Sequence, residues 1–155
     1  MLEKNSIYED LGKIVERNNV LKDEPMSKHT SFKTGGIADF FIKIENENQL
    51  KGILKYANKN KIPITVVGNG TNLLVRDKGI RGIVVSLKMQ EINLKEQNDK
   101  IIIEAGAGTP IIKLSKIAKD NNLQGLEFAI RNTWDNWWSN KNERRGIWSR
   151  NIKCN

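Results

Sequence analysis

The chain has 155 residues, enough for one domain or two small lobes and too few for two ordinary domains. Its formal net charge is +8, which is compatible with an acidic partner, but the lysines are spread along the sequence and we interpret most of the excess as a solvated surface. A single cysteine, Cys154, excludes an internal disulfide and a cysteine-based metal site, and no apolar run approaches the roughly 18 residues of a membrane span, so we expect a cytoplasmic protein.

The first 60 residues predict helices alternating with strands. Ser6 and Glu9 fit a capping box, which predicts a helix over residues 6–18, and Pro25 ends a short extended piece. A polar loop with a glycine pair, residues 28–36, then leads into a predicted strand over Ile37–Ile44. A second helix is predicted over residues 47–59. Its expected buried stripe consists of Leu50, Ile53, Leu54 and Ala57.

The strongest candidate binding element is the next stretch, which predicts a strand, a glycine loop and a second strand. Ile64–Val67 is a β-branched run after Pro63, and Leu73–Val75 is a second apolar run. The loop between them consists of Gly68, Asn69, Gly70, Thr71 and Asn72. Its glycines permit positive φ and close approach of a ligand, and its N–H groups and polar side chains are possible donors to a phosphate.

Two common phosphate-binding motifs do not match this loop. A Walker loop requires a Lys followed by Ser or Thr, and the dinucleotide fingerprint requires a glycine where Leu73 stands and a helix after it. The predicted order of strand, helix and strand places the loop at the carboxyl end of a strand, where α/β sheets bind ligands. The alternative is an ordinary turn between two core strands.

The second half of the chain predicts three more strands and a helix. The strands are expected over Ile83–Leu87, around Ile92 to Leu94, and over Lys100–Ala105. Residues 106–110 form another glycine loop, in which we expect Thr109 to be the N-cap of a helix and Pro110 its first residue. This helix N-terminus is a further candidate anion site, and an ordinary strand-to-helix connection is the alternative.

Isolated residues add little chemistry. We interpret His29 as a solvated loop histidine, because no acidic partner or metal-ligand spacing lies near it in the sequence, and Lys33 as a surface lysine. The sequence shows no pair of carboxylates, no serine with a placed base and no metal-binding cluster. It therefore predicts binding loops rather than a catalytic centre.

Four motifs, in their order and spacing, resemble the UDP-N-acetylenolpyruvoylglucosamine reductase family, also called UDP-N-acetylmuramate dehydrogenase, over residues 20–130. They cover residues 29–39, 67–75, 106–108 and 125–129. The resemblance implies an α+β fold, the FAD-binding domain of the vanillyl-alcohol-oxidase (PCMH) type, here truncated. It also implies that Gly68, Asn69, Gly70, Thr71, Asn72 and Leu73 hold the FAD pyrophosphate.

The resemblance further implies a reaction and its partners. In this family NADPH reduces FAD, which passes a hydride to the enolpyruvyl group of a UDP-sugar during peptidoglycan synthesis. The serine proton donor and its arginine and glutamate helpers follow the matched region, so no residue up to 130 inherits a catalytic role and we expect this chain to be inactive. We expect a monomer with no nucleic-acid or membrane partner and no metal.

After Ile130 the sequence departs from the family. All four tryptophans lie in residues 131–155, at Trp134, Trp137, Trp138 and Trp148. The tryptophan codon TGG, read one nucleotide later, always encodes glycine, and these four positions coincide with glycines of the motif that the family has here. The other codons permit the same shift; Arg131 to Trp134, for example, then reads Gly-Ile-Pro-Gly. We therefore predict that residues 131–155 are an out-of-frame, disordered tail.

The predicted organisation is an N-terminal helix in residues 1–19, a first FAD-binding lobe in 20–87, the start of a second lobe in 88–130, and the tail. Two other functions remain open. One is a different flavin oxidoreductase with the same fold, against which the segment from Thr30 to Gly36 argues. The other is a non-catalytic basic module whose tryptophan-rich tail binds nucleic acid or anionic lipid.

Overall fold

A computed structural model describes residues 3–97, 100–126 and 152–153. The chain forms two compact units, Met1–Lys88 and Met89–Asn155. No helix in the described ranges is long and apolar enough to cross a membrane.

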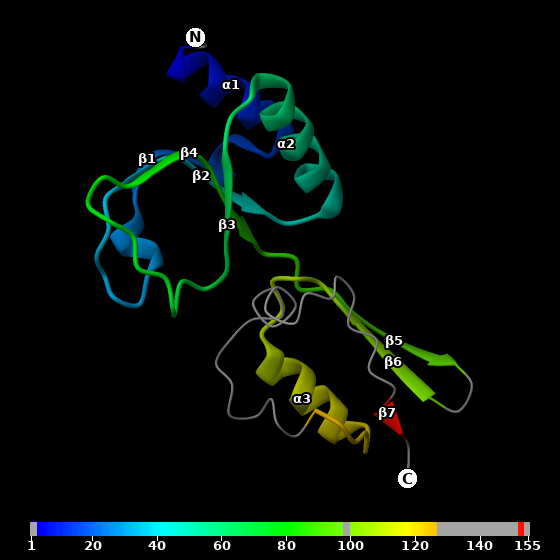
Figure 1. Cartoon of the computed structure of the whole chain (residues 1–155). Coiled ribbons are helices and arrows are strands. Elements are labelled where there is room, and N and C mark those ends of the chain that lie inside the picture. The colour runs from blue at the N-terminus through cyan, green and yellow to red at the C-terminus, as the bar shows by residue number, and fades with distance from the viewer. Residues whose placement is uncertain (1–2, 98–99, 127–151, 154–155) are drawn as a thin grey trace. The chain divides into compact units, whose positions relative to one another are not determined.

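The first unit is built on a four-stranded sheet in the order β1-β2-β4-β3 (Figure 1). The strands are β1 (Val20–Pro25), β2 (Ile37–Ile44), β3 (Ile64–Val67) and β4 (Ile80–Leu87). β1 pairs antiparallel with β2, whereas β2, β4 and β3 are parallel to one another. The carboxyl ends of three parallel strands therefore meet at one edge of this sheet.

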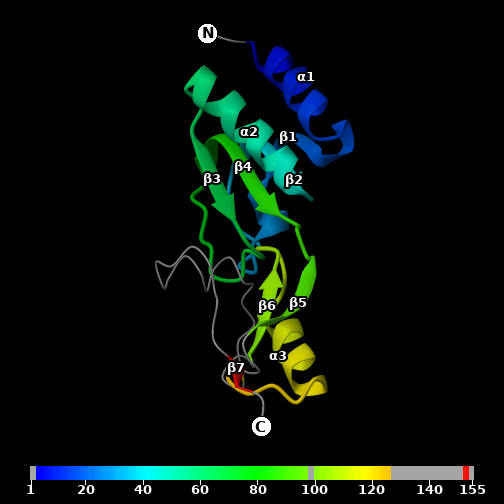
Figure 2. The ribbon, with the colours of Figure 1, turned by 90° about the vertical axis from the view of Figure 1, so that its right-hand side faces the viewer.

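Two helices, α1 (Lys4–Ile14) and α2 (Glu47–Asn60), lie side by side in the first unit (Figure 1, Figure 2). α2 forms the crossover from β2 to β3, as parallel pairing requires. The Asn46 side chain accepts a hydrogen bond from the Gln49 N–H at 3.0 Å and so caps the helix. Of the predicted stripe, Ile53 and Ala57 are buried, but Leu54 is 46% exposed, which makes the contact face narrower than predicted.

Loops cover the other face of this sheet. Met26 lies in the short 3₁₀ helix η2 (Met26–His29), and Val75 lies in the segment after β3. Both residues are buried against Phe41 and Val84 of the central strands. Because side chains alternate across a strand, Phe41 and Val84 face these loops while their neighbours in the chain face away from them.

Two predictions for the first unit are wrong. α1 begins at Lys4 with Glu3 at the N-cap and no side-chain capping bond, so Ser6 and Glu9 lie inside the helix, which ends at Ile14 instead of residue 18. The predicted strand Leu73–Val75 is irregular chain, because β4 pairs with both β2 and β3 and Val75 is buried as part of the loop core.

The second unit contains an antiparallel pair, β5 (Ile92–Gln97) and β6 (Lys100–Ala105), and the helix α3 (Ile111–Asp120). The two-residue strand β7 (Ile152–Lys153) pairs with the start of β6. The core of this unit joins apolar residues of α3 and the following turn to the sheet. It contains Leu114, Ala118, Leu123 and Leu126, packed by Ile92, Ile101, Ile103 and Ala105. Apart from β7, the predicted out-of-frame tail lies outside the described residues.

Candidate functional site

The glycine loop at residues 68–73 follows β3 directly, at the carboxyl edge of the parallel strands. Gly70 has φ +67°, and a Cβ added to it would lie 1.8 Å from the carbonyl oxygen of His29. Both its conformation and its surroundings therefore require glycine at position 70. Gly68 does not have positive φ, so of these two loop glycines Gly70 is the one whose backbone conformation requires glycine.

The backbone donors of this loop are available for a ligand. Within the described part of the chain, the N–H groups of Gly70, Thr71, Asn72 and Leu73 donate to no carbonyl or side chain. Thr71 and Asn72 are also exposed. Successive unpaired N–H groups, two of them on exposed residues, carry partial positive charge, which is a chemical match for an anion.

The polar segment after η2 holds this loop in place. The Ser31 N–H donates to the Gly70 carbonyl at 3.0 Å, and the Gly36 N–H donates to the Arg76 carbonyl at 3.0 Å. A Cβ on Gly36 would lie 1.9 Å from the carbonyl oxygen of Asp77, so the two segments approach too closely for any side chain there. Ser31 and Gly36, both in the predicted polar loop over residues 28–36, thus fix the path of residues 70–77.

A pocket of about 420 Å³ lies where the glycine loop meets the ends of β2 and β4. Polar and basic groups predominate among its lining residues. These are Lys28, His29, Thr30, Ser31, Phe41, Lys43, Gly68, Asn69, Ser86 and Lys88. Lys43, Ser86 and Lys88 are not among the site residues predicted from the sequence, although polar residues near the ends of apolar strands are a usable signal.

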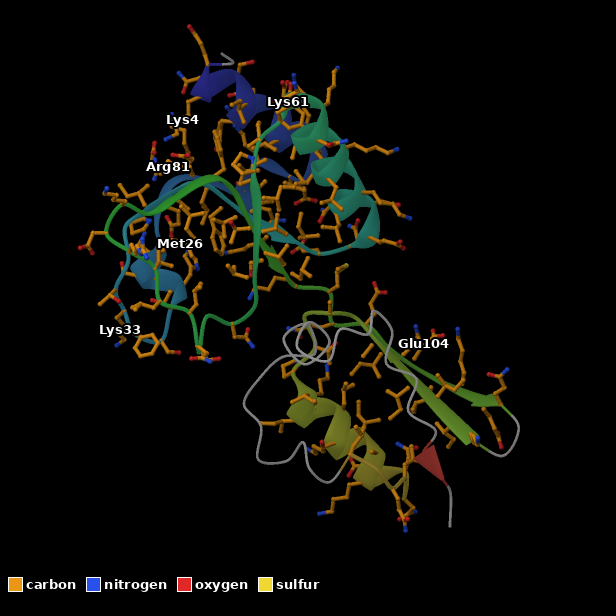
Figure 3. The ribbon with its side chains drawn as sticks, in the orientation of Figure 1. Lys4, Met26, Lys33, Lys61, Arg81 and Glu104 are labelled. Carbon is orange, nitrogen blue, oxygen red and sulfur yellow. The ribbon has the colours of Figure 1, made fainter. Side chains whose placement is uncertain are left out.

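His29 is not a solvated histidine, and this prediction is wrong. Its ring stacks on Phe41 with the centroids 3.9 Å apart, and Nε2 lies 3.0 Å from a carboxylate oxygen of Glu24. The acidic partner lies five residues earlier, across η2, so it is close in space although the sequence pattern gave no sign of it. Lys33, in contrast, is exposed as predicted; Figure 3 shows it beside the loop end of the first unit.

A charged cluster lies over the opposite end of the same sheet (Figure 3). Asp39 accepts hydrogen bonds from the Arg81 guanidinium at 2.7 Å and from the Gly82 N–H at 2.9 Å, and it lies 3.5 Å from the Lys4 ammonium. Lys4 also pairs with Asp23, and this hydrogen bond holds the pKa of Asp23 below its ordinary value. The carboxylates are satisfied within the cluster, so its role is to join α1, β2 and β4.

The second glycine loop, residues 106–110, is a poor anion site. Its N–H groups at Gly106, Gly108 and Thr109 donate to backbone carbonyls at 2.8–2.9 Å. The prediction that Thr109 caps the helix is wrong, because Pro110 occupies the N-cap position and no side-chain cap is formed. The Thr109 side chain is fully buried, and its hydroxyl oxygen has no hydrogen-bond partner among the residues that the structure describes.

The described residues contain no group of three or more His, Cys, Asp or Glu side chains placed to hold a metal ion. The alternative of a tryptophan-rich binding tail concerns residues 131–155, which lie outside the described part of the chain except for β7.

Comparison with known proteins identifies enzymes that are similar to this chain in sequence. UDP-N-acetylenolpyruvoylglucosamine reductase of Staphylococcus aureus (strain Newman) is 42% identical over 129 residues, 83% of this chain and 41% of the relative. The Staphylococcus epidermidis enzyme of the same name is 42% identical over 128 residues. The chain thus spans about two fifths of the length of the curated relatives that it matches.

Solved structures support the same fold. The crystal structure of UDP-N-acetylenolpyruvylglucosamine reductase from Thermus caldophilus is similar with a TM-score of 0.54 and 28% identity, over 73% of this chain and 38% of that chain. A VAO-type flavoprotein from Myceliophthora thermophila has a TM-score of 0.61 at 14% identity, over 80% of this chain and 33% of its own, which is a likeness of fold. The predicted α+β fold of the vanillyl-alcohol-oxidase type is confirmed.

Residues 38–133 match the family model of the FAD binding domain. The matched range begins at Ala38 in β2 and includes the glycine loop with its unpaired N–H groups and the pocket residues Lys43, Ser86 and Lys88. Since this family model matches well over half of the 155 residues, the chain belongs to the FAD-binding domain family.

Proposed function

We propose that residues 68–73 bind the pyrophosphate of FAD, and that the chain supplies this part of a UDP-N-acetylenolpyruvoylglucosamine reductase. The activity is the one named for the staphylococcal relatives. Membership of the FAD-binding domain family rests on the match over residues 38–133.

The observation that carries the proposal is the difference between the two glycine loops. The N–H groups of Gly70, Thr71, Asn72 and Leu73 are unpaired in the described part of the chain, whereas those of Gly106, Gly108 and Thr109 are used within the fold. Three features of residues 68–73 fit a pyrophosphate: the available N–H donors, the exposure of Thr71 and Asn72, and a glycine at position 70 that holds the donors in place.

When bound, FAD supplies hydride transfer. The residues of this chain have positioning roles. Gly70 sets the path of the loop against the His29 carbonyl, and Ser31 holds that path through its bond to the Gly70 carbonyl. A fixed set of N–H donors does not have to reorganise when an anion arrives, which favours binding.

The proposal includes a UDP-sugar as substrate, in line with the name of the reductases among the relatives. It also includes NADPH as hydride source, which the resemblance in sequence implies. It also includes a cytoplasmic, monomeric protein; size-exclusion chromatography with light scattering checks the oligomeric state. We expect no turnover from this chain, because the serine, arginine and glutamate of the family have no counterpart in its first 130 residues. NADPH oxidation with added FAD and the UDP-sugar tests this.

Binding is tested by titrating the purified chain into FAD and following the quenching of flavin fluorescence. Asn72→Asp adds a negative charge to the loop with almost no change in shape. A like charge close to the pyrophosphate is expected to weaken FAD binding by about tenfold or more. Asn18→Asp is the matched control, because Asn18 is an exposed residue in the 3₁₀ helix η1 (Arg17–Asn19). Equal FAD affinity in all three proteins would contradict the proposal.

A further inference from the structure

We propose that the pocket beside Gly68 and Asn69 is a built diphosphate subsite, in which Lys43 and Lys88 neutralise the two phosphates and Ser86 donates a hydrogen bond. This inference deepens the proposed function and rests on it for the identity of the ligand. It adds three side chains to a site that the glycine loop alone would form with backbone groups.

The strand register brings these side chains together. Lys43 on β2 is paired with Ser86 on β4, and Ser86 is paired in turn with Val67, the last residue of β3 before the loop. Lys88 follows two residues after Ser86 and, by alternation, lies on the same face of the strand path. All three line the pocket, at the edge of the sheet where parallel strands bind ligands.

Ser86 is the most informative of the three residues. It is 2% exposed, yet its hydroxyl makes no hydrogen bond to the described residues. It lines the pocket, and its oxygen is not among the atoms shut off from solvent without a partner. At the end of an otherwise apolar strand, the Ser86 hydroxyl is thus a polar group that faces the cavity and is available to donate a hydrogen bond to a bound ligand.

The two lysines are available for the same ligand. Lys43 is half-buried and Lys88 is exposed, and neither forms an ion pair within the described part of the chain. Lys28, which also lines the pocket, differs from them because its ammonium lies 3.4 Å from Glu24. Two unpaired ammonium groups match the two negative charges of a dinucleotide pyrophosphate.

The remaining walls favour a compact anion over a flat ring. The stacked pair of His29 and Phe41 already closes one side of the pocket. Gly68 and Asn69 are the loop residues that line the pocket, and the unpaired N–H groups begin at the next residue, Gly70. A diphosphate placed here would lie among Lys43, Lys88 and Ser86, next in the chain to the backbone donors of the loop. This predicts a preference for FAD and ADP over riboflavin, which has no phosphate.

The test uses the full chain and three ligands: FAD and riboflavin followed by flavin fluorescence, and ADP followed by isothermal titration calorimetry. Lys43→Met and Lys88→Met are each expected to weaken FAD and ADP binding by about tenfold. They should also reduce the salt dependence of FAD binding. Lys55→Met is the matched control, because Lys55 is an exposed lysine on α2 with the same charge and length. Ser86→Ala should weaken the same two ligands with unchanged far-UV circular dichroism.

Each outcome decides between this inference and the proposed function. FAD binding by the wild type that Lys43→Met and Lys88→Met leave unchanged would overturn the subsite and leave the proposed function standing. ADP binding that depends on the two lysines, without FAD binding, would support the subsite and contradict the proposed function. An equal loss of riboflavin and FAD affinity in Lys43→Met and Lys88→Met would also overturn the inference, because riboflavin has no phosphate. Binding of neither FAD nor ADP would contradict both.

Discussion

The carbonyl oxygen of His29 occupies the space that a side chain on Gly70 would need: the two positions are 1.8 Å apart. The same histidine stacks on Phe41 of β2 and bonds to Glu24 of β1. The path of the candidate phosphate loop is therefore set by a residue about 40 positions earlier in the chain, which is itself fixed to the sheet.

Gly70→Ala is expected to destabilise the protein by at least about 2 kcal/mol, because the alanine would have to adopt a positive φ and its Cβ would overlap the His29 carbonyl oxygen. Gly12→Ala is the matched control. Gly12 lies within α1 with no atom closer than 3.6 Å to an added Cβ, so alanine should be neutral or stabilising by up to about 1 kcal/mol. Urea unfolding measures both; similar free energies of unfolding for the two variants would contradict the close approach.

His29→Ala is expected to cost about 1–3 kcal/mol, because it removes the ring stacked on Phe41 and the hydrogen bond to Glu24. His29→Phe keeps a ring and loses the bond, so its cost should be smaller. Thermal unfolding of both variants separates the two contributions. An equal loss in both would show that the ring contributes nothing to stability.

The pair of Lys4 and Asp23 predicts a pH dependence. Their hydrogen bond lowers the pKa of Asp23 from 3.8 and raises the pKa of Lys4 from 10.5. The contribution of Asp23 to the stability of the folded protein is present above its unfolded pKa of 3.8 and is lost as the pH falls through the lower folded pKa. The contribution of Lys4 to stability is present below its unfolded pKa of 10.5 and is lost as the pH rises through the higher folded pKa.

Lys4→Met should therefore lower the unfolding temperature at pH 7 and lose its effect near pH 2. The shift is expected to be small, since both side chains are largely exposed. Lys55→Met, which removes a lysine from α2, serves as the control. A shift for Lys4→Met that is the same at both pH values would mean that the effect does not come from this ion pair.

Thr109→Val is expected to stabilise the protein by about 1 kcal/mol, because it removes a buried hydroxyl without a hydrogen-bond partner and keeps the shape of the side chain. Thr30→Val is the matched comparison. The Thr30 hydroxyl is part of a buried residue and donates to the Thr34 carbonyl at 3.1 Å, so its loss should destabilise by about 1 kcal/mol. Effects of the same sign in chemical denaturation would contradict this distinction.

The proposal of an out-of-frame tail predicts what the coding DNA encodes in the neighbouring reading frame. Read one nucleotide later after codon 130, it should encode a glycine-rich segment that begins Gly-Ile-Pro-Gly and has glycine in place of Trp137 and Trp138. Sequencing the gene from the source DNA checks this. A different reading in that frame would disprove the proposal.

The sequence alone determined the elements whose signals are local. The apolar runs Ile37–Ile44 and Lys100–Ala105 are strands with the predicted bounds, and the helix predicted over 47–59 is α2 (Glu47–Asn60). The glycine spacing at Gly68 and Gly70 singled out the loop. The predictions of the two strands and the helix are confirmed, because the spacing of apolar residues and the β-branched content act within a few residues.

The tertiary structure decided what depends on contacts between distant residues. Leu73–Val75 has the composition of a strand, but β4 already has a partner on each side. Which glycine loop keeps free donors depends on where other segments run. Met89 and Glu91 accept hydrogen bonds from the second loop, whereas within the described residues no segment accepts from the N–H groups of residues 70–73. Lys43 and Ser86 are 43 positions apart in the sequence and meet through strand register, a pairing that no local pattern encodes.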